Sequence, residues 1–361
     1  MQHLMVKILK YSTVTRWTWR KQICIPFGIL VVVALLSLHC KQKSSAEPKP
    51  QKQVQTEPNA VPFKPEPPLA KIPVQKDIAI GNFFQFLEKI VQQHDTLSGY
   101  PLSENLLLRA NPWILDSLVN TDYYIQKSMG NFVYDQKRMR VLKSGDTLLI
   151  PGPQTAAALL EKMSKTWLNI NIPAFELRIQ EGDSVLFKCP VRVGKSKKKY
   201  LEAAGHTVDL RTRTGTGEII RVNQFPIFID PVTGERFKFT KRDDHLTTLM
   251  PQIPWLEPTI NGQRLGQMIH PTTNPRSLGK PASNGCIGMS EADAWRVYFF
   301  APLGTKVYVR YDLKEINAAG DTLLYEDIYR IRRTGKPSKP VAVAGLWPEK
   351  TTGICVCDTL F

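Results

Sequence analysis

The spacing of hydrophobic residues divides the chain into a helical part and a strand-rich part. Residues 81–97 and 103–119 carry apolar side chains at helical intervals, which predicts two amphipathic helices. Ser103 is placed to cap the second helix, and Pro112 interrupts it. Residues 139–153 then alternate as a strand, turn at a Ser-Gly-Asp triplet and continue as a short apolar strand that stops at a proline.

From Thr166 onward the pattern is that of a β protein. Short segments alternate apolar and polar residues or run as β-branched stretches, and turn residues separate them. Only residues 290–300 have helical spacing, with Ser290 as their N-cap and two acidic residues in the first turn. Many strands with one helix predict a mainly β fold of the sandwich type. The strand segments are 167–180, 184–194, 217–229 and 305–313.

The first forty residues resemble an export signal. Basic residues precede the apolar run Ile23–Leu38, whose 16 residues are fewer than the ~20 that a membrane-spanning helix needs. Cys40 follows, as the lipidated cysteine of a bacterial lipoprotein does, although His39 replaces the usual small residue. An uncleaved membrane anchor is the alternative. Both interpretations of residues 1–40 predict that the rest of the chain is exported to the periplasmic cell envelope and tethered to a membrane.

Residues 41–76 have the composition of an extended linker. They hold eight prolines and many Lys and Gln, and they cannot bury enough apolar surface to fold. At ~3.1 Å per residue such a tether reaches on the order of 100 Å. Residues 1–76 also carry +9 of the formal net charge of +16. The remaining positive charge fits either an anionic substrate or a solvated face. The sequence shows no basic helix interleaved with aromatic residues, which would have predicted nucleic-acid binding.

Cys286 lies in the stretch SNGCIGM, where its neighbours favour reactivity. Gly285 lets the main chain bend, and the helix predicted over 290–300 follows, so unpaired backbone amides there would stabilise a thiolate or an oxyanion. A thiol with an ordinary pKa of ~8.5 needs a base. His270, at the end of an apolar strand 16 positions upstream, is the candidate. The alternative is that Cys286 is a small core residue.

The stretch IHPTTNPRSLGKPASNGCIGM resembles the signature of the L,D-transpeptidase catalytic domain, the YkuD family. In that family a histidine precedes a Ser/Thr-His-Gly-Cys motif by a similar interval. The segments IPAFELRI, CPVRVG and TRTGTGEI extend the resemblance, which covers residues 166–311. It implies an L,D-transpeptidase-type β-sandwich with a short helix after the catalytic cysteine. It also implies a cysteine acyltransferase, without a metal or cofactor, that acts on peptidoglycan stem peptides.

The resemblance implies a role for each matching residue. Cys286 matches the nucleophile, His270 the base and Ser283 the hydroxyl of the motif. The backbone N–H groups of Gly285 and Cys286 match the oxyanion hole, and Thr272 is assigned to substrate binding. The thiolate would attack the carbonyl of the third stem residue and expel the terminal D-alanine. An amine of a second stem peptide would then resolve the thioester.

Two positions depart from the family pattern. Asn284 replaces the histidine that usually precedes Gly-Cys, which changes pocket shape and donor pattern rather than the proton acceptor. Gly288, also assigned to substrate binding, stands where the family often has Arg or Asn, which puts substrate anchoring in doubt. The basic run of Lys195 and residues 197–199 is either a replacement for that side chain or a solvated loop.

Several activities fit these residues. Acyl transfer to a stem amine defines an L,D-transpeptidase, transfer to water an L,D-carboxypeptidase, and transfer to a protein lysine an anchoring enzyme. A non-catalytic peptidoglycan-binding lipoprotein is the alternative from another class, and Asn284 and Gly288 support it. A general cysteine peptidase shares the nucleophile and base but not the strand motifs. Because carbapenems acylate members of the resembling family, β-lactam acylation of Cys286 is expected.

The remaining segments carry weaker signals. Residues 77–152 are predicted as a small α+β segment whose phrase LKSGDTLLIPGP resembles the closing strand of LysM modules, which implies contact with peptidoglycan glycan; a helical spacer is the alternative. Cys189 is predicted to be a buried strand residue. Residues 312–361 are predicted to add a hairpin and a loose tail, which contains Cys355 and Cys357.

Overall fold

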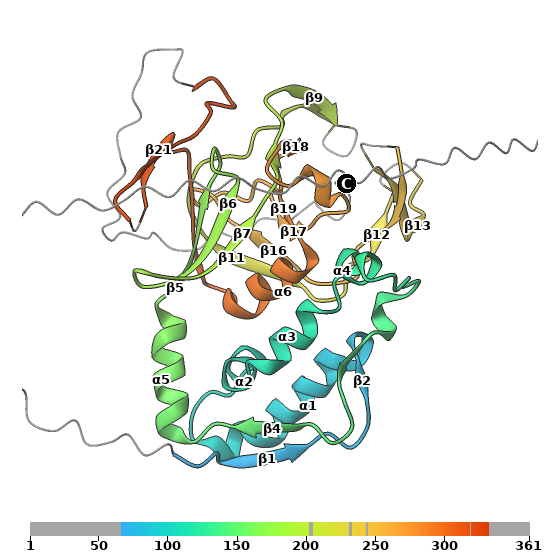
Figure 1. Cartoon of the computed structure of the whole chain (residues 1–361), viewed down its shortest axis with the longest axis vertical. Helices are drawn as coiled ribbons and strands as arrows, with labels where there is room; N and C mark the ends of the chain where they lie inside the picture. The colour runs from blue at the N-terminus through green and yellow to red at the C-terminus, as the bar shows by residue number, and fades with distance from the viewer. Residues whose placement is uncertain (1–65, 202–204, 231–232, 243–244, 318, 332–361) are drawn as a thin grey trace, which may run out of the picture. The chain divides into compact units, whose positions relative to one another are not determined.

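The computed structural model describes residues 66–331 apart from four short gaps (Figure 1). No helix within this described part is long and apolar enough to cross a membrane. The gaps are residues 202–204, 231–232, 243–244 and 318. The predictions for segment 1–40, Cys40, most of the linker, and the tail with Cys355 and Cys357 lie outside the described residues.

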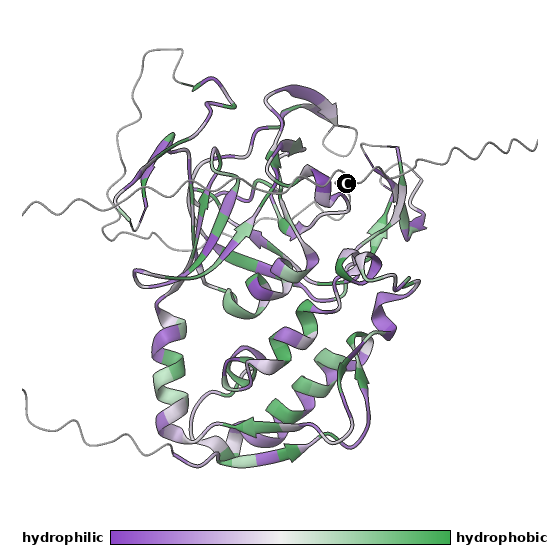
Figure 2. Cartoon of the chain, viewed as in Figure 1, coloured by the Kyte–Doolittle hydropathy of each residue, from purple (hydrophilic) through white to green (hydrophobic). Residues whose placement is uncertain are grey.

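The N-terminal region is built from helices between two short strand pairs. β1 pairs with β4, and β2 pairs with β3, both antiparallel. In Figure 2 the helices of this region carry both green and purple stretches, as amphipathic helices do. In chain order the elements are β1 (Ala70–Pro73), β2 (Ile78–Ala79), α1 (Ile80–Ser98), α2 (Glu104–Ala110), α3 (Trp113–Val119), α4 (Tyr123–Ser128), the 3₁₀ helix η1 (Gln136–Arg138), β3 (Arg140–Leu142), β4 (Thr147–Ile150) and α5 (Pro153–Ser164).

Local chemistry sets the ends of these helices. The Ser103 hydroxyl accepts a hydrogen bond from the Leu106 N–H at 3.1 Å, which confirms the predicted N-cap of α2. Asn111 ends α2, and its side chain both donates to and accepts from the main chain of Leu149 in β4. Pro112 then starts α3, as a proline can because its missing N–H is not needed there.

The C-terminal region is organised around one mixed eight-stranded sheet, so the mainly β fold class is confirmed. Its strand order is β19-β17-β16-β11-β20-β5-β6-β7. The pairs β17–β19 and β20–β5 are parallel, and the other neighbours are antiparallel. The strands are β5 (Thr166–Asn171), β6 (Glu176–Glu181), β7 (Ser184–Pro190), β11 (Gly215–Asn223), β16 (Trp255–Pro258), β17 (Ile269–Pro271), β19 (Ile287–Met289) and β20 (Lys306–Arg310).

The long strand β11 joins the two halves of this sheet. Its first residues, from Gly215, pair with β20, and its residues from Ile219 onward pair with β16 across a register shift. Gly217 lies at the changeover, where an added Cβ would come within 1.7 Å of the carbonyl oxygen of Thr259. Glycine is therefore required at this point, because two main chains approach too closely for a side chain.

Several smaller strand pairs lie outside the eight-stranded sheet. β8 pairs in parallel with β18, while the remaining pairs are short antiparallel hairpins. The last hairpin, β21–β22, is the one predicted in the C-terminal segment. The elements are β8 (Val193–Gly194), β9 (Lys198–Leu201), β10 (His206–Asp209), β12 (Phe228–Ile229), β13 (Arg236–Phe237), β14 (Phe239–Lys241), β15 (Thr247–Leu249), the 3₁₀ helix η3 (Pro275–Ser277), β18 (Pro281–Ser283), β21 (Lys314–Ile316) and β22 (Thr322–Leu324).

The helix α6 (Glu291–Phe300) packs between the sheet and the N-terminal helices. Trp295 and Phe299 are fully buried, and their rings meet those of Phe83 and Phe84 of α1. Ser290 caps α6 as predicted, because its hydroxyl accepts from the Asp293 N–H. One hydrophobic core runs through both regions, so the N-terminal helices are packed onto the β region rather than separated from it.

Polar contacts tie the two regions together at the start of α6. The buried carboxyl group of Glu291 accepts from the Tyr123 N–H at 2.8 Å and from the side chain of Gln136. In return, the Asp122 carboxylate accepts from the Ala292 N–H at 3.0 Å. Side chains at the start of α4 and of α6 thus each accept from a backbone N–H in the first turn of the other helix. Helix ends otherwise leave these N–H groups unpaired.

Three expectations need correction or addition. The predicted linker 41–76 extends too far, because Ala70–Pro73 form β1 against β4. The helix does not directly follow Cys286, because the strand β19 intervenes. Helix α5 was not anticipated, although its proline at the first turn and its Ala/Leu-rich sequence are helix signals. The LysM-like resemblance of residues 77–152 stays a prediction.

Candidate active site

Two neighbouring parallel strands bring His270 and Cys286 together. In the β17–β19 pair, Ile269 is opposite Ile287, and His270 is opposite Gly288. Because side chains alternate between the two faces of a strand, Cys286, two positions before Gly288, faces the same side as His270. Both residues line one cleft of about 130 Å³. The fold therefore places the two predicted residues on the same cleft, and their catalytic roles stay a prediction.

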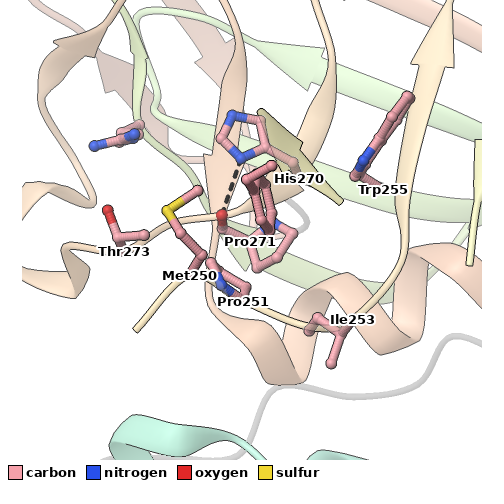
Figure 3. Close-up of a pocket in the computed structure, with 9 residues that line it drawn as sticks. Met250, Pro251, Ile253, Trp255, His270, Pro271 and Thr273 are labelled. Carbon is pink, nitrogen blue, oxygen red and sulfur yellow. Dashed lines mark hydrogen bonds between the residues drawn. The ribbon is translucent and has the colours of Figure 1, made fainter. Parts of the chain in front are cut away.

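The imidazole of His270 is buried and held in one tautomer. Its Nδ1 lies 2.9 Å from the carbonyl oxygen of Pro271, which can only accept, so Nδ1 carries the proton (Figure 3). Nε2 is left as the acceptor that a base needs. Burial, together with the positive charge of Arg192, lowers the pKa of His270 to about 4. The ring is therefore neutral at physiological pH.

The Cys286 thiol lies between two main-chain groups. Its Sγ accepts from the Met268 N–H at 3.4 Å and donates to the Gly266 carbonyl oxygen at 3.8 Å. Burial raises the pKa of Cys286, while the Met268 amide and the Arg192 charge lower it. The raised pKa of Cys286 and the lowered pKa of His270 mean that the resting site holds a thiol and a neutral imidazole.

A tight loop presents the nucleophile. The Ser283 hydroxyl donates to the Cys286 carbonyl at 2.6 Å and accepts from the Gly285 N–H at 3.2 Å. Gly285 has φ +119°, a conformation that side-chain-bearing residues rarely adopt. The hydroxyl of Ser283 thus closes the turn. It also engages the Gly285 amide, which was expected to contribute to an oxyanion hole.

A second layer of hydrogen bonds supports this loop. The buried Thr212 hydroxyl donates to the Gly285 carbonyl at 2.9 Å and accepts from the Gly194 N–H at 2.8 Å. The Tyr329 hydroxyl donates to the Gly194 carbonyl at 2.9 Å and accepts from the Thr212 N–H at 3.1 Å. Sequence reasoning missed the roles of Thr212 and Tyr329. Thr212 begins the segment TRTGTGEI that extends the family resemblance, whereas no motif points to Tyr329.

The cleft around the pair is strongly cationic. Among the described residues that line it, four are basic and none is Asp or Glu. A second, largely apolar cavity of about 20 Å³ adjoins it and includes Met250, Trp255 and His270 (Figure 3). A ligand with an acidic group and an aliphatic part would match this combination. The basic residues of the cleft are Arg192, Lys195, Lys241 and Arg242.

The match to a protein family covers this whole site. Residues 165–309 match the family model of the L,D-transpeptidase catalytic domain, YkuD. A Bacillus licheniformis protein named as an L,D-transpeptidase YkuD is 26% identical over 168 residues, which are 46% of this chain and 76% of the relative.

Solved L,D-transpeptidase structures are similar at a coarse level. The Mycobacterium smegmatis L,D-transpeptidase is 19% identical with a TM-score of 0.29, covering 40% of this chain and 58% of that one. A Xylanimonas cellulosilytica L,D-transpeptidase is 16% identical with a TM-score of 0.30, covering 68% and 100%. The Enterococcus faecium catalytic domain acylated by ertapenem is 15% identical with a TM-score of 0.27, covering 40% and 97%. These TM-scores are low, so the family assignment rests on the sequence match.

Not every residue of the matched segment lies where its predicted role requires. Thr272, assigned to substrate binding, is buried, and its hydroxyl accepts from the Asn274 N–H within its own loop; Thr273 and Asn274 line the cleft. Asn284 lines the cleft and is exposed, in keeping with a site-shaping role. Of the basic run, Lys195 lines the cleft, whereas residues 197–199 are exposed and are not among its lining residues.

The other potentially reactive residues of the matched segment lie apart from the site. Cys189 is fully buried, as predicted, and burial raises its pKa well above the ordinary value. Within the described residues, no three His, Cys, Asp or Glu side chains gather as metal ligands.

Proposed function

We propose that this protein is a cell-envelope L,D-transpeptidase that crosslinks peptidoglycan stem peptides through a thioester on Cys286. The observation that carries the proposal is the His270–Cys286 pair. A buried thiol and a neutral imidazole of fixed tautomer face one cleft from adjacent strands, inside a domain of the matching family. The retained pair also weighs against a non-catalytic wall-binding protein.

In the first step, Nε2 of His270 takes the Cys286 proton as Sγ attacks the carbonyl carbon of the third stem residue. The negative oxygen of the tetrahedral intermediate would be held by backbone N–H groups, with that of Cys286 central. Use of the Gly285 amide requires its 3.2 Å bond to Ser283 to open. The imidazolium then protonates the departing nitrogen, so D-alanine leaves and a thioester remains.

In the second step, an amine of another stem peptide attacks the thioester. His270 accepts the amine proton and returns it to the sulfur, so that a new amide forms and the thiol is restored. Water in place of the amine would give an L,D-carboxypeptidase, and a protein lysine would give an anchoring enzyme. Export through residues 1–40, a lipid on Cys40 and glycan binding by residues 77–152 are parts of the same proposal, which places the domain beside its wall substrate.

The test is turnover of purified disaccharide-tetrapeptide by the full chain, read by mass spectrometry. Wild type, Cys286→Ala and His270→Ala would be compared, with Cys189→Ala as the matched control for loss of a buried thiol. Dimers linked between third residues, made by wild type and the control alone, would support the transpeptidase. Release of D-alanine without dimers would move the assignment to a carboxypeptidase. No turnover by any protein would refute an enzymatic function.

The same nucleophile should open a β-lactam. Attack of Cys286 on a carbapenem carbonyl breaks the strained ring amide and leaves a thioester with no departing group, so the whole drug stays attached. The expected result is a mass increase equal to one carbapenem on wild type and none on Cys286→Ala. An unchanged adduct on the variant would place the reaction elsewhere.

A further inference from the structure

The space beside Gly288 is filled by the side chain of Arg192. A Cβ atom added at Gly288 would lie 2.7 Å from Nε and 2.9 Å from Cγ of Arg192. The two main chains hold this contact, because the N–H of Arg192 donates to the Gly288 carbonyl at 2.8 Å and the N–H of Gly288 donates to the Arg192 carbonyl at 3.0 Å. Glycine at 288 and arginine at 192 are therefore a matched pair.

This contact places a guanidinium next to the reacting groups. Gly288 is the register partner of His270, so the Arg192 side chain crosses the strand pair beside the imidazole. Its Nη1 donates to the Ser277 hydroxyl at 3.3 Å, which helps to fix its direction. The positive charge of Arg192 acts on both His270 and Cys286 and lowers the pKa of each.

Arg192 differs from the other basic residues of the cleft. Lys195, Lys241 and Arg242 line the cationic cleft, whereas Arg192 lines both that cleft and the apolar cavity behind His270. Of the four basic residues that line the cleft, only Arg192 also lines the apolar cavity.

We propose that Arg192 binds the terminal carboxylate of the departing D-alanine, and so supplies from a neighbouring segment the side chain that position 288 lacks. The inference rests on the proposed function. In the donor peptide this carboxylate is separated from the scissile nitrogen by one carbon atom, so a cation beside the nucleophile meets it before any other acidic group. A guanidinium suits the task because it can donate two parallel hydrogen bonds to a carboxylate.

The competing explanation is that Arg192 acts only on the thiol and imidazole. Both roles slow the reaction when Arg192 is changed, so loss of turnover alone cannot separate them. The terminal carboxylate of the donor peptide distinguishes the two roles of Arg192. A tetrapeptide whose terminal carboxylate is converted to an amide keeps the scissile bond but loses the group that Arg192 is proposed to bind.

The experiment pairs Arg192→Gln with this amidated donor, using the full chain. With the free-acid donor, Arg192→Gln is expected to lower kcat/KM by roughly ten- to hundred-fold, the range of a lost charged hydrogen bond. With the amidated donor, wild type and variant should differ by less than a few-fold. Lys197→Ala, which removes an exposed cation outside the cleft, is the matched control. An equal loss on both donors, or no loss on either, would overturn the proposal.

A binding arm keeps the inference separate from the proposed function. In a Cys286→Ala background, the free-acid tetrapeptide should bind more tightly than its amide, and Arg192→Gln should remove the difference. If no protein turns over yet this preference holds, the enzymatic proposal fails and the assignment of Arg192 stands. If the enzyme is active but shows no such preference, the assignment of Arg192 fails alone.

The double variant Arg192→Gly with Gly288→Arg moves the guanidinium to the neighbouring strand. We expect it to recover part of the discrimination between acid and amide donors that Arg192→Gly loses. Gly288→Arg alone should be the worse single variant, because its side chain meets Arg192 within 3 Å. A double variant no better than either single change would count against an exchange of roles between these positions.

Discussion

His270 donates its Nδ1 proton to the carbonyl oxygen of Pro271, the residue that follows it, at 2.9 Å. The backbone of the next residue thereby orients the base. The carbonyl fixes the tautomer yet adds no negative charge to stabilise an imidazolium. Together with burial and Arg192, this explains why the resting pair is uncharged.

The first prediction concerns pH. Because the pKa of His270 is lowered to about 4, the ring loses its proton below the usual histidine range and is a competent base at every higher pH. The acid limb of kcat/KM is expected near pH 4 rather than near 6.5. A pH profile between 3.5 and 8 measures it, and a limb in the ordinary histidine range would contradict the buried, neutral base. Arg192→Gln should move the acid limb to higher pH, because removal of the neighbouring cation raises the pKa of His270.

The second prediction concerns the turn before the nucleophile. Ser283→Ala removes the bond to the Cys286 carbonyl, so the thiol should lose its fixed position. A misplacement of this kind costs on the order of a hundred-fold in rate. We expect kcat to fall by about ten- to hundred-fold, with a loss of about 1–3 kcal/mol of stability from the buried groups left unpaired. Ser283→Thr, which keeps the hydroxyl, is the control, and an unchanged kcat in Ser283→Ala would refute the role.

The third prediction concerns the C-terminal segment. Tyr329→Phe leaves the buried Gly194 carbonyl and Thr212 amide without their partner. Such a loss costs about 1–3 kcal/mol of stability. Because Thr212 holds the Gly285 carbonyl, kcat should fall as well. Denaturant unfolding and steady-state turnover measure the two effects.

Tyr325→Phe is the matched control for that change. It removes a hydroxyl of the same segment that bonds Glu315 in the β21–β22 hairpin, away from the cleft. It should leave kcat unchanged. Equal losses of kcat in both tyrosine variants would mean that the segment matters only for general stability.

Features set by neighbours in sequence were predictable. Ser103 and Ser290 cap their helices as expected, because a cap depends on a side chain and an amide only three residues apart. The amphipathic spacing of residues 81–97 likewise predicted α1, since its apolar face follows from the period alone. Cys286 and His270 were found through a motif whose spacing reflects one strand–loop–strand unit.

Features set by distant pairing were not predictable. Cys286 precedes a strand rather than a helix because β19 pairs in parallel with β17, and three residues are too few to show a strand period. Arg192 lies 94 positions before Cys286, and only the fold brings it over Gly288. Thr272 was predicted to bind substrate, yet its hydroxyl accepts from the Asn274 N–H within its own loop.

The last prediction concerns Glu291, which joins α6 to the N-terminal helices. Burial, with a smaller effect of the Asp122 charge, raises the pKa of Glu291 to about 8. In the unfolded chain the carboxyl loses its proton near its ordinary pKa of 4.5, whereas the folded protein keeps it until about pH 8. Between these values the folded state binds more protons, so this group makes stability fall as pH rises.

Glu291→Gln mimics the protonated carboxyl and removes that titration. Its side-chain carbonyl can still accept from the Tyr123 amide and Gln136. We expect the melting temperature of the variant, relative to wild type, to increase steadily from pH 5 to pH 8. Glu291→Ala, which leaves both donors unpaired, should instead lose about 1–3 kcal/mol at every pH. Parallel pH profiles for wild type and Glu291→Gln would show that Glu291 is ionised in the folded protein.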